Sequence, residues 1–485
     1  MFQPTLRRAA LALVLFSAPA AAFAQTNAGA TPQQGSSTRK DPGALKVLNL
    51  PDYGRWNRIT NTAISPDGSW MTYTLQPNDG DATLIVKRLD GDKVYSVNAG
   101  TAPTAGRGDG GGGFGVAAAN EPRFSDDSRF VGYYVNPAGS QARPRTGRQG
   151  GPSGGGRGGN ASASASEGER KFELLNLQTG DKLDVPNAAS FKFAKGGHWL
   201  AVRTNKIASD TTHDGADLLL RDLTSATSRN IGNVNQYDFD DSGRLFAYSV
   251  DASEHLGNGV YLVDLASEET KTLDGAAQTY DQLQWSSDGT DLAVLRGTKA
   301  ADKKLRENVL LAWTNLGTPK STKFEYDPAK DASFPTGMVL SEFSTPRFSR
   351  DGAHLFVGIK EQETEPAKTD EPQANVDVWH WKDPDPQSVQ MIRIQQLRRA
   401  TYPASVVLAT KHFVKLGNDD MPVIAPTANG KWAIGRDDAA YRGEVAWGGS
   451  HADYYRVNPE TGERTLIERK VVRTMGTSPD GKWFL

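Results

Sequence analysis

The sequence contains no cysteine among its 485 residues. A chain without thiols forms no disulfide bonds, has no thiolate nucleophile and offers no cysteine ligand to a metal. The lack of cysteine behind the N-terminal segment also argues against a lipid anchor there. The formal net charge is only −2, so we expect no electrostatic attraction to nucleic acid or to an anionic membrane. With 37% hydrophobic residues, the composition is typical of a soluble globular protein.

Long hydrophobic runs are also absent. The apolar run at 9–16 follows Arg7 and Arg8, and small residues at 22–24 are typical of a cleavage site. Because a membrane-spanning helix needs about 20 apolar residues, this run is too short to be one. We therefore predict a cleaved signal peptide at 1–24 and a periplasmic or secreted protein. The polar residues 25–44 predict a disordered leader.

What the sequence does contain is a repeated turn. In ISPDGSWMTYTL, residues 64–75, Pro66 presets the backbone of a turn and Asp67 can accept hydrogen bonds from the local backbone. Gly68 suits a positive φ. Apolar residues stand on both sides of this turn, so the stretch predicts a β-hairpin.

Related hairpins follow along the chain. If the last turn residue is used as a marker, they fall at positions 68, 128, 197, 243, 289, 352, 430 and 481. The shortest step is 46 residues, close to the ~40–45-residue period of a four-stranded propeller blade. Longer steps leave room for loop insertions.

A second strand pair follows each of the first seven hairpins. The expected pairs are at 83–97, 171–185, 217–231, 259–273, 308–322, 376–386 and 453–467. Strands such as 245–248 and 355–357 are apolar at consecutive positions, which is typical of strands buried on both faces. We therefore predict an all-β fold over 45–485, a β-propeller of four-stranded antiparallel blades. It would have seven blade-like units and the start of an eighth.

Several segments interrupt the repeat. The Gly-rich tracts at 105–115 and 138–160 predict disordered loops of the first two blades, and 360–375 predicts a charged loop. Residues 387–400 predict a helix with Val389, Ile392 and Leu397 facing inward, and 406–416 an extra hairpin. At the start, Leu45, Val47, Leu50 and Trp56 could form a short packed entry segment.

The search for catalytic residues is negative. A G-x-S-x-G pattern occurs at 151–155, but Ser153 lies in a glycine tract, without the strand and helix that a nucleophile elbow requires. Arg148 and Arg157 resemble RNA-binding segments only in composition. We predict no catalytic, cofactor-binding or metal site in this chain.

Histidines and acidic pairs give no stronger signal. No two of the seven histidines have metal-ligand spacing, and each is expected in a loop or on a sheet surface (positions 198, 213, 255, 354, 380, 412 and 451). The pairs 126–127, 240–241, 419–420 and 437–438 are interpreted as turn residues, with calcium binding a remote alternative. Trp379 and Trp381 are expected on one face of a strand.

Serial Ser-Pro-Asp-Gly hairpins, with outer turns such as 177–180 and 458–462 and a secretion signal, resemble the propeller part of exported bacterial serine peptidases. The family is prolyl oligopeptidase, with its dipeptidyl- and acylaminoacyl-peptidase branches. The stretches 48–68 and 376–383 are similar to one long bacterial branch. Tol-B-like propellers share the turn.

The resemblance implies that a C-terminal α/β-hydrolase domain carries the catalytic serine, aspartate and histidine and takes peptide substrates. No position of this chain matches those residues, and Leu485 stands only a few residues into an apolar strand. We therefore interpret the chain as a truncated propeller.

Two functions remain open. One is the substrate-gating propeller of a secreted serine peptidase, catalytically silent by itself. The other is a stand-alone envelope propeller that binds a protein or peptide through its central channel or loops. A propeller-type lyase or glycosidase is a weaker third reading.

Overall fold

Four-stranded antiparallel sheets follow one another along the chain. The structure, a computed structural model, describes residues 48–100, 121–137, 170–206, 209–210, 212–365, 378–380, 383, 385–444 and 449–485. Residues Leu50–Leu485 form one compact unit, apart from Met1–Asn49. The tracts at 105–115 and 138–160, with the predicted signal peptide and leader, lie outside the described residues.

The first three blades begin after the short helix α1 (Leu50–Tyr53). Their strands are β1 (Asn57–Ile64), β2 (Trp70–Pro77), β3 (Ala82–Arg88) and β4 (Val94–Gly100); β5 (Arg123–Phe124), β6 (Phe130–Val135), β7 (Lys171–Asn176) and β8 (Lys182–Val185); and β9 (Ala188–Phe193), β10 (Trp199–Thr204), β11 (Ala216–Asp222) and the start of β12 (Ser228–Phe239).

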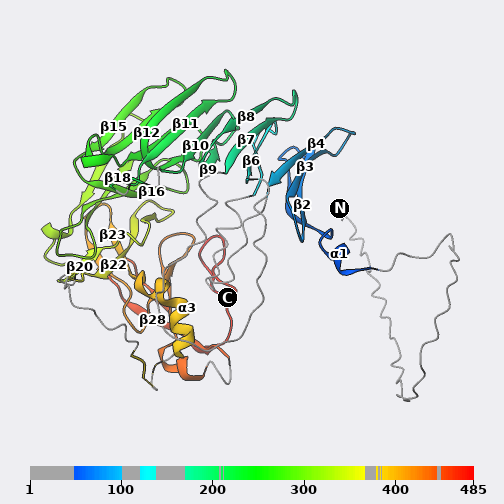
Figure 1. Cartoon of the computed structure of the whole chain (residues 1–485). Coiled ribbons are helices and arrows are strands. Elements are labelled where there is room, and N and C mark those ends of the chain that lie inside the picture. Colours follow the sequence, from blue (N-terminus) through cyan, green and yellow to red (C-terminus); the bar gives the residue numbers. More distant parts are fainter. Residues whose placement is uncertain are drawn as a thin grey trace, which may run out of the picture. The chain divides into compact units, whose positions relative to one another are not determined.

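The fourth blade shares β12 with the third, so Figure 1 shows β9 to β15 as one continuous sheet. The remaining strands are β13 (Leu245–Val250), β14 (Gly259–Asp264) and β15 (Thr270–Gly275); β16 (Thr279–Trp285), β17 (Leu292–Thr298), β18 (Glu307–Thr314) and β19 (Thr322–Tyr326); β20 (Met338–Leu340), β21 (Arg347–Phe348), β22 (His354–Glu361), β23 (Tyr402–Val407) and β24 (Phe413–Lys415); and β25 (Val423–Pro426), β26 (Ala433–Asp437), β27 (Ala452–Val457) and β28 (Arg464–Val471). Short 3-10 turns are η2 (Ser253–His255), η3 (Pro328–Lys330) and η4 (Ala439–Glu444).

This architecture confirms the predicted fold, a β-propeller of four-stranded antiparallel blades with seven blade units. Six hydrophobic clusters among the described residues each join two consecutive blades. Along β13, Leu245 and Ala247 pack toward the fifth blade, whereas Phe246 and Tyr248 pack toward the third. Because side chains alternate along a strand, burial on both faces requires this unbroken apolar run.

Seven of the eight repeated turns share one side-chain hydrogen bond, and the third, which begins at Ala194, has no side chain to form it. In the first blade, the Ser65 hydroxyl accepts from the Trp70 N–H at 2.9 Å and donates to Asp67 at 2.6 Å, while Asp67 also accepts from the Ser69 N–H. These donors, Ser65 first, lower the pKa of the Asp67 carboxyl. The same Ser, Thr or Asp contact to the amide five residues on recurs in six later turns (Ser125, Asp240, Ser286, Ser349, Thr427 and Ser478).

All eight predicted marker positions have a positive φ, and Ser128 is the one that is not glycine. Most of these turns also pack on the preceding one. A Cβ at Gly197 would lie 2.8 Å from the Asp127 carboxylate, and one at Gly289 would lie 2.5 Å from the Asp241 nitrogen. The eighth turn continues the stack, because the Asn429 amide donates to the Asp480 carbonyl at 3.1 Å.

The sixth blade differs from the prediction. Residues 378–380 are not a strand, and Trp379 is exposed rather than packed in a blade; Trp381 lies outside the described residues. Residues 402–415 instead supply strands β23 and β24, so the expected extra hairpin is the second hairpin of this blade. The blade closes because β22 pairs directly with β23 across the 40 residues that separate them.

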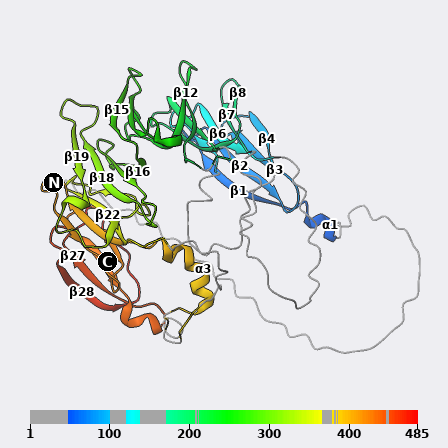
Figure 2. The same ribbon diagram turned by 60° about the vertical axis from the view of Figure 1, so that its left-hand side comes forward.

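Helix α3 (Gln387–Arg398) confirms the predicted helix but not its packing. The helix has no buried residue: Val389 is half-buried, and Ile392 and Leu397 are exposed. Figure 2 shows α3 beside the sheets. The prediction of a packed entry segment was also wrong for the residues that the structure describes, because Leu50 and Trp56 are exposed. Leu45 and Val47 lie outside the described residues.

Candidate functional site

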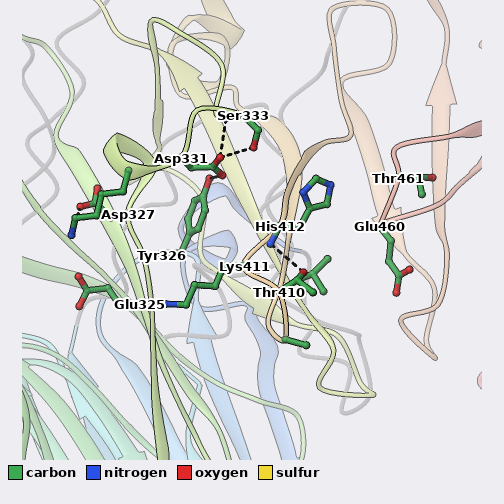
Figure 3. Close-up of a pocket in the computed structure, with 13 residues that line it drawn as sticks. Glu325, Tyr326, Asp327, Asp331, Ser333, Thr410, Lys411, His412, Glu460 and Thr461 are labelled. Carbon is green, nitrogen blue, oxygen red and sulfur yellow. Dashed lines mark hydrogen bonds and ion pairs between the residues drawn. The ribbon is translucent and has the colours of Figure 1, made fainter.

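A cavity of about 1070 Å³ lies where the outer parts of the fifth, sixth and seventh blades meet. Its walls are the end of β19 with η3, the turn between β23 and β24, and the turn between β27 and β28 (Figure 3). The lining residues are Glu325, Tyr326, Asp327, Lys330, Asp331, Ser333, Val407, Ala409, Thr410, Lys411, His412, Glu460 and Thr461. A volume slightly above the ~300–1,000 Å³ that is common for ligand sites makes it a candidate functional site.

The fifth-blade wall is held by two aspartates. Asp327 caps η3 by accepting from the Ala329 N–H at 3.1 Å, and it pairs with Lys330 at 3.1 Å. Asp331 accepts from the Tyr326 hydroxyl at 2.7 Å and from both the amide and the hydroxyl of Ser333, at 2.8 and 2.6 Å. These donors, Ser333 first, lower the pKa of Asp331, and the nearby imidazole of His412 lowers it further. Asp331 is therefore a fixed, ionised carboxylate.

The sixth-blade wall is a tight turn. The Val407 and Lys411 amides close it, donating to the His412 carbonyl at 2.9 Å and the Val407 carbonyl at 2.8 Å. Lys411 has a φ of 59° and places its ammonium 5.6 Å from the centre of the Phe324 ring. In the view of Figure 3, the imidazole of His412 lies between Asp331 and Glu460. The turn thus presents an exposed histidine to the cavity.

The seventh-blade wall is the predicted outer turn at 458–462. Asn458 accepts from the Glu460 N–H at 2.8 Å, and Gly462 closes the turn with a φ of 74°. The Glu460 side chain is 63% exposed, and its carboxylate lies 3.7 Å from Nε2 of His354. His354 begins β22, and its side chain is only 4% exposed. Neither ring nitrogen of His354 has a hydrogen-bond partner among the described residues.

The prediction for His354 was therefore wrong, since this histidine is buried. The residue at this position of a blade donates its amide back to the turn, and Trp70 and Phe130, which hold the position in the first two blades, are buried as His354 is. Tryptophan or phenylalanine holds the position in four other blades, at Trp70, Phe130, Trp199 and Trp432. His354 packs as an aromatic ring there and stacks on Phe356.

The cavity holds a serine, an aspartate and a histidine, but they are not arranged for nucleophilic catalysis. A serine nucleophile must donate its proton to a base that a third group orients. Here Ser333 donates to Asp331 itself, and the His412 amide, at 3.4 Å from the Thr410 hydroxyl, only holds the turn. Within the described part of the chain, no three His, Asp or Glu side chains are placed to share a metal ion.

The sequence-based candidates do not meet in this cavity. Ser153, Arg148 and Arg157 lie outside the described residues. Three of the four acidic pairs contain a turn residue: Asp127 and Asp240 accept from the Arg129 and Leu245 amides, and Asp437 from that of Ala439. In the fourth pair, Asp419 accepts from the Tyr402 hydroxyl instead. The cavity residues were missed because they stand on three turns far apart in sequence. Only the 458–462 turn carried a visible signal.

No family model matches the chain, and no curated protein matches it. Solved structures do match. The tricorn protease is 9% identical, with 92% of this chain and 36% of that chain covered and a TM-score of 0.33. The propeller domain of the trilobed protease from Pyrococcus furiosus is 8% identical over 89% and 99% of the two chains, with a TM-score of 0.30.

The acylaminoacyl peptidase of Pyrococcus horikoshii is 9% identical, with a TM-score of 0.29. The match covers 86% of this chain and 53% of that one, so the chain spans about half the length of that peptidase. Prolyl endopeptidases are also among the similar structures. In the described residues, no helix combines the length and the apolar character that crossing a membrane requires.

Proposed function

We propose that this chain is the substrate-gating propeller region of a secreted serine peptidase that hydrolyses peptides. In this proposal the catalytic triad belongs to a separate α/β-hydrolase domain, and the propeller controls which peptides reach it. The observation that carries the proposal is the series of Ser-x-Asp-Gly turns. The family resemblance rests on these turns, and the turns that begin at Ser65, Ser286, Ser349 and Ser478 share one hydrogen-bonded form with a glycine of positive φ at the end.

A gate must keep its shape while peptides pass. Six apolar interfaces and the stack of turns make consecutive blades pack as one rigid series. A rigid propeller can exclude folded proteins by size alone and admit short or extended peptides. This physical character supports gating rather than chemistry as its task.

We expect purified residues 25–485 to leave peptide and ester substrates unhydrolysed above background and to resist labelling by a fluorophosphonate. The reason is that Ser333, the serine of the cavity, donates to the carboxylate of Asp331, whereas a serine nucleophile donates its proton to an oriented base. The same chain continued through a hydrolase domain should both hydrolyse peptides and be labelled by the fluorophosphonate. Stoichiometric labelling of the 25–485 protein would reveal an active site in the propeller itself.

The alternative is a stand-alone envelope propeller that binds a protein or peptide. The cavity between the fifth, sixth and seventh blades favours it, since its lining needs no further domain. Affinity capture from the envelope fraction distinguishes the two. A stable partner without hydrolase activity would favour the binding propeller, whereas covalent continuity with a hydrolase domain would favour the peptidase.

Export is a separate expectation. The apolar run at 9–16 and the small residues at 22–24 predict cleavage before Gln25. N-terminal sequencing of the protein from a periplasmic or secreted fraction should start at Gln25. Recovery in the cytoplasm with Met1 still present would contradict both the signal peptide and the assigned compartment.

A further inference from the structure

We propose that this chain associates head to tail with a second copy of itself, so that the first blade of one copy packs against the eighth turn unit (476–485) of the other. This inference does not depend on the proposed peptidase function. It rests on the pattern that the six interfaces between consecutive blades share, and on two apolar faces that the chain leaves uncovered.

Each interface between two blades uses fixed positions of the repeat. Counted from the turn marker, the residue three positions on packs toward the preceding blade in blades two to seven (Val131, Leu200, Phe246, Leu292, Leu355 and Ala433). The residue four positions on packs toward the following blade in blades three to six (Ala201, Ala247, Ala293 and Phe356). Because side chains alternate along a strand, the two sets lie on opposite faces of each blade.

The first blade has no preceding blade among the described residues, and its corresponding face is apolar. Met71 stands three positions after the marker Gly68, and alternation and cross-strand pairing place further apolar side chains beside it. This leading face consists of Ile59, Ile64, Met71, Tyr73, Leu75 and Ile85. Ile59 and Ile64 are 65% and 66% exposed, and the other four are half-buried, whereas Trp70 on the opposite face is buried. The first blade therefore presents one half of an interface between blades.

The turn of the first blade is uncovered on the same side. In five later turns, a Cβ on the marker glycine would lie under 3.0 Å from an atom of the preceding turn (Gly197, Gly243, Gly289, Gly430 and Gly481). A Cβ on Gly68 would meet no atom within 4 Å, and among the later marker glycines only Gly352 has the same open space. The position of a preceding turn is thus free at the first blade, which is a second observation independent of the apolar side chains.

The eighth turn unit carries the other half of the interface. Phe484 stands three positions after the marker Gly481 and faces the seventh blade, as the pattern requires, with its ring centre 5.4 Å from that of Tyr454. Trp483 and Leu485, two and four positions after the marker, therefore face away from the seventh blade. They are 69% and 73% exposed and form the trailing face.

A second copy is the partner that fits both faces. Six interfaces within the chain already join one blade to the next in this way, so the same contact between two copies continues an existing interface. The chain does not cover the faces itself, because Ile64 and Trp483 are exposed in the same structure. Within the described residues, no hydrophobic cluster joins the first blade to the eighth unit. Since the two faces differ, each copy in a pair keeps one face free, and association should continue into chains of copies.

The test is size-exclusion chromatography with light scattering of residues 25–485 over a series of protein concentrations. We expect the mean mass of the wild type to rise with concentration. Ile64→Glu on the leading face and Trp483→Glu on the trailing face should each weaken association about tenfold or more, because a carboxylate buried in an apolar contact has no partner. Leu256→Glu, at an exposed apolar residue of the fourth blade, is the matched control and should associate as the wild type does.

A mixture of the two face variants tests the head-to-tail arrangement itself. Ile64→Glu keeps its trailing face and Trp483→Glu its leading face, so an equimolar mixture should form dimers at concentrations at which either variant alone is monomeric. Both substituted residues are exposed, so both variants should keep the melting temperature of the wild type. A wild type that stays monomeric at all concentrations, or a mixture that forms no dimers, would overturn the proposal.

Cross-linking identifies the partner. Because the chain has no cysteine, a double variant with Met71→Cys and Trp483→Cys carries one thiol on each face and no other. A short bismaleimide should link different chains into a ladder of dimers and larger species. A link within one chain would show that the propeller closes on itself and would overturn the second copy as partner, as would the absence of any link.

Discussion

Replacing Gly243 by alanine is expected to lower the free energy of unfolding by roughly 2–4 kcal/mol. Gly243 ends the turn of the fourth blade with a φ of 70°, where a side chain costs about 1–2 kcal/mol. A Cβ there would also overlap the carbonyl oxygen of Lys195, in the turn of the third blade. Because that oxygen belongs to the backbone, the two blades must separate to relieve the overlap.

Gly352→Ala is the matched control. Gly352 has nearly the same φ, 68°, but no atom lies within 4 Å of its ideal Cβ position. The Gly352→Ala variant should lose only the cost of placing a side chain at positive φ, about 1–2 kcal/mol of the free energy of unfolding. Urea denaturation of both variants measures the difference. Equal losses in the two variants would show that the stacking of turns contributes nothing to the joint between the third and fourth blades.

Asp274→Ala is expected to cost about 2–4 kcal/mol, because it leaves the buried Tyr280 hydroxyl and the largely buried Arg296 without their carboxylate. Asp274, at the end of β15, is 9% exposed and accepts from Lys323 at 2.5 Å, from the Tyr280 hydroxyl at 2.6 Å and from Arg296 at 3.0 Å. These donors belong to β16, β17 and β19, so the carboxylate joins the fourth blade to the fifth. Arg296 is 17% exposed and keeps only Glu325 at 3.5 Å.

The effect should depend on pH in a defined direction. Burial alone would raise the pKa of Asp274, but Lys323, Tyr280 and Arg296 together hold it below its usual value. Its stabilisation is therefore present above the unfolded-state pKa of about 3.9 and is lost as the pH falls through the lower folded-state pKa. The difference in unfolding free energy between the wild type and Asp274→Ala should thus narrow in acid. Asp90→Ala, which removes an exposed pair with Arg88, should have little effect at any pH. A gap of constant size down to pH 2 would contradict the assigned role of Asp274.

The fold could be predicted from sequence because its signals are local. A turn such as Ser65 to Trp70 is specified by residues that contact one another within six positions, and the chain contains eight turns of this kind. Blade strands such as β13 are apolar on both faces because each face has its own neighbour. Both the turn residues and the apolar strands can be recognised in a single sequence.

The sixth blade and the cavity could not be predicted because long-range pairing decides them. The aromatic residues Trp379 and Trp381 suggested a strand, but β22 pairs instead with β23, which begins 40 residues further along the chain. His354 gives no local sign of burial; only the repeat gives one, because Trp70 and Phe130, two residues after the turn markers of their blades, are buried too. Asp331, His412 and Glu460 are brought together by three blades, and no spacing in the sequence relates them.

The coding DNA that follows the codon of Leu485 in the native gene tests the central proposal most directly. If this chain is the gating propeller of a serine peptidase, the reading frame should continue into an α/β-hydrolase domain. There a G-x-S-x-G serine should stand between a strand and a helix, with an aspartate and a histidine later in the chain. A frame that ends after a completed blade, with no hydrolase sequence, would contradict the peptidase proposal and leave the binding propeller.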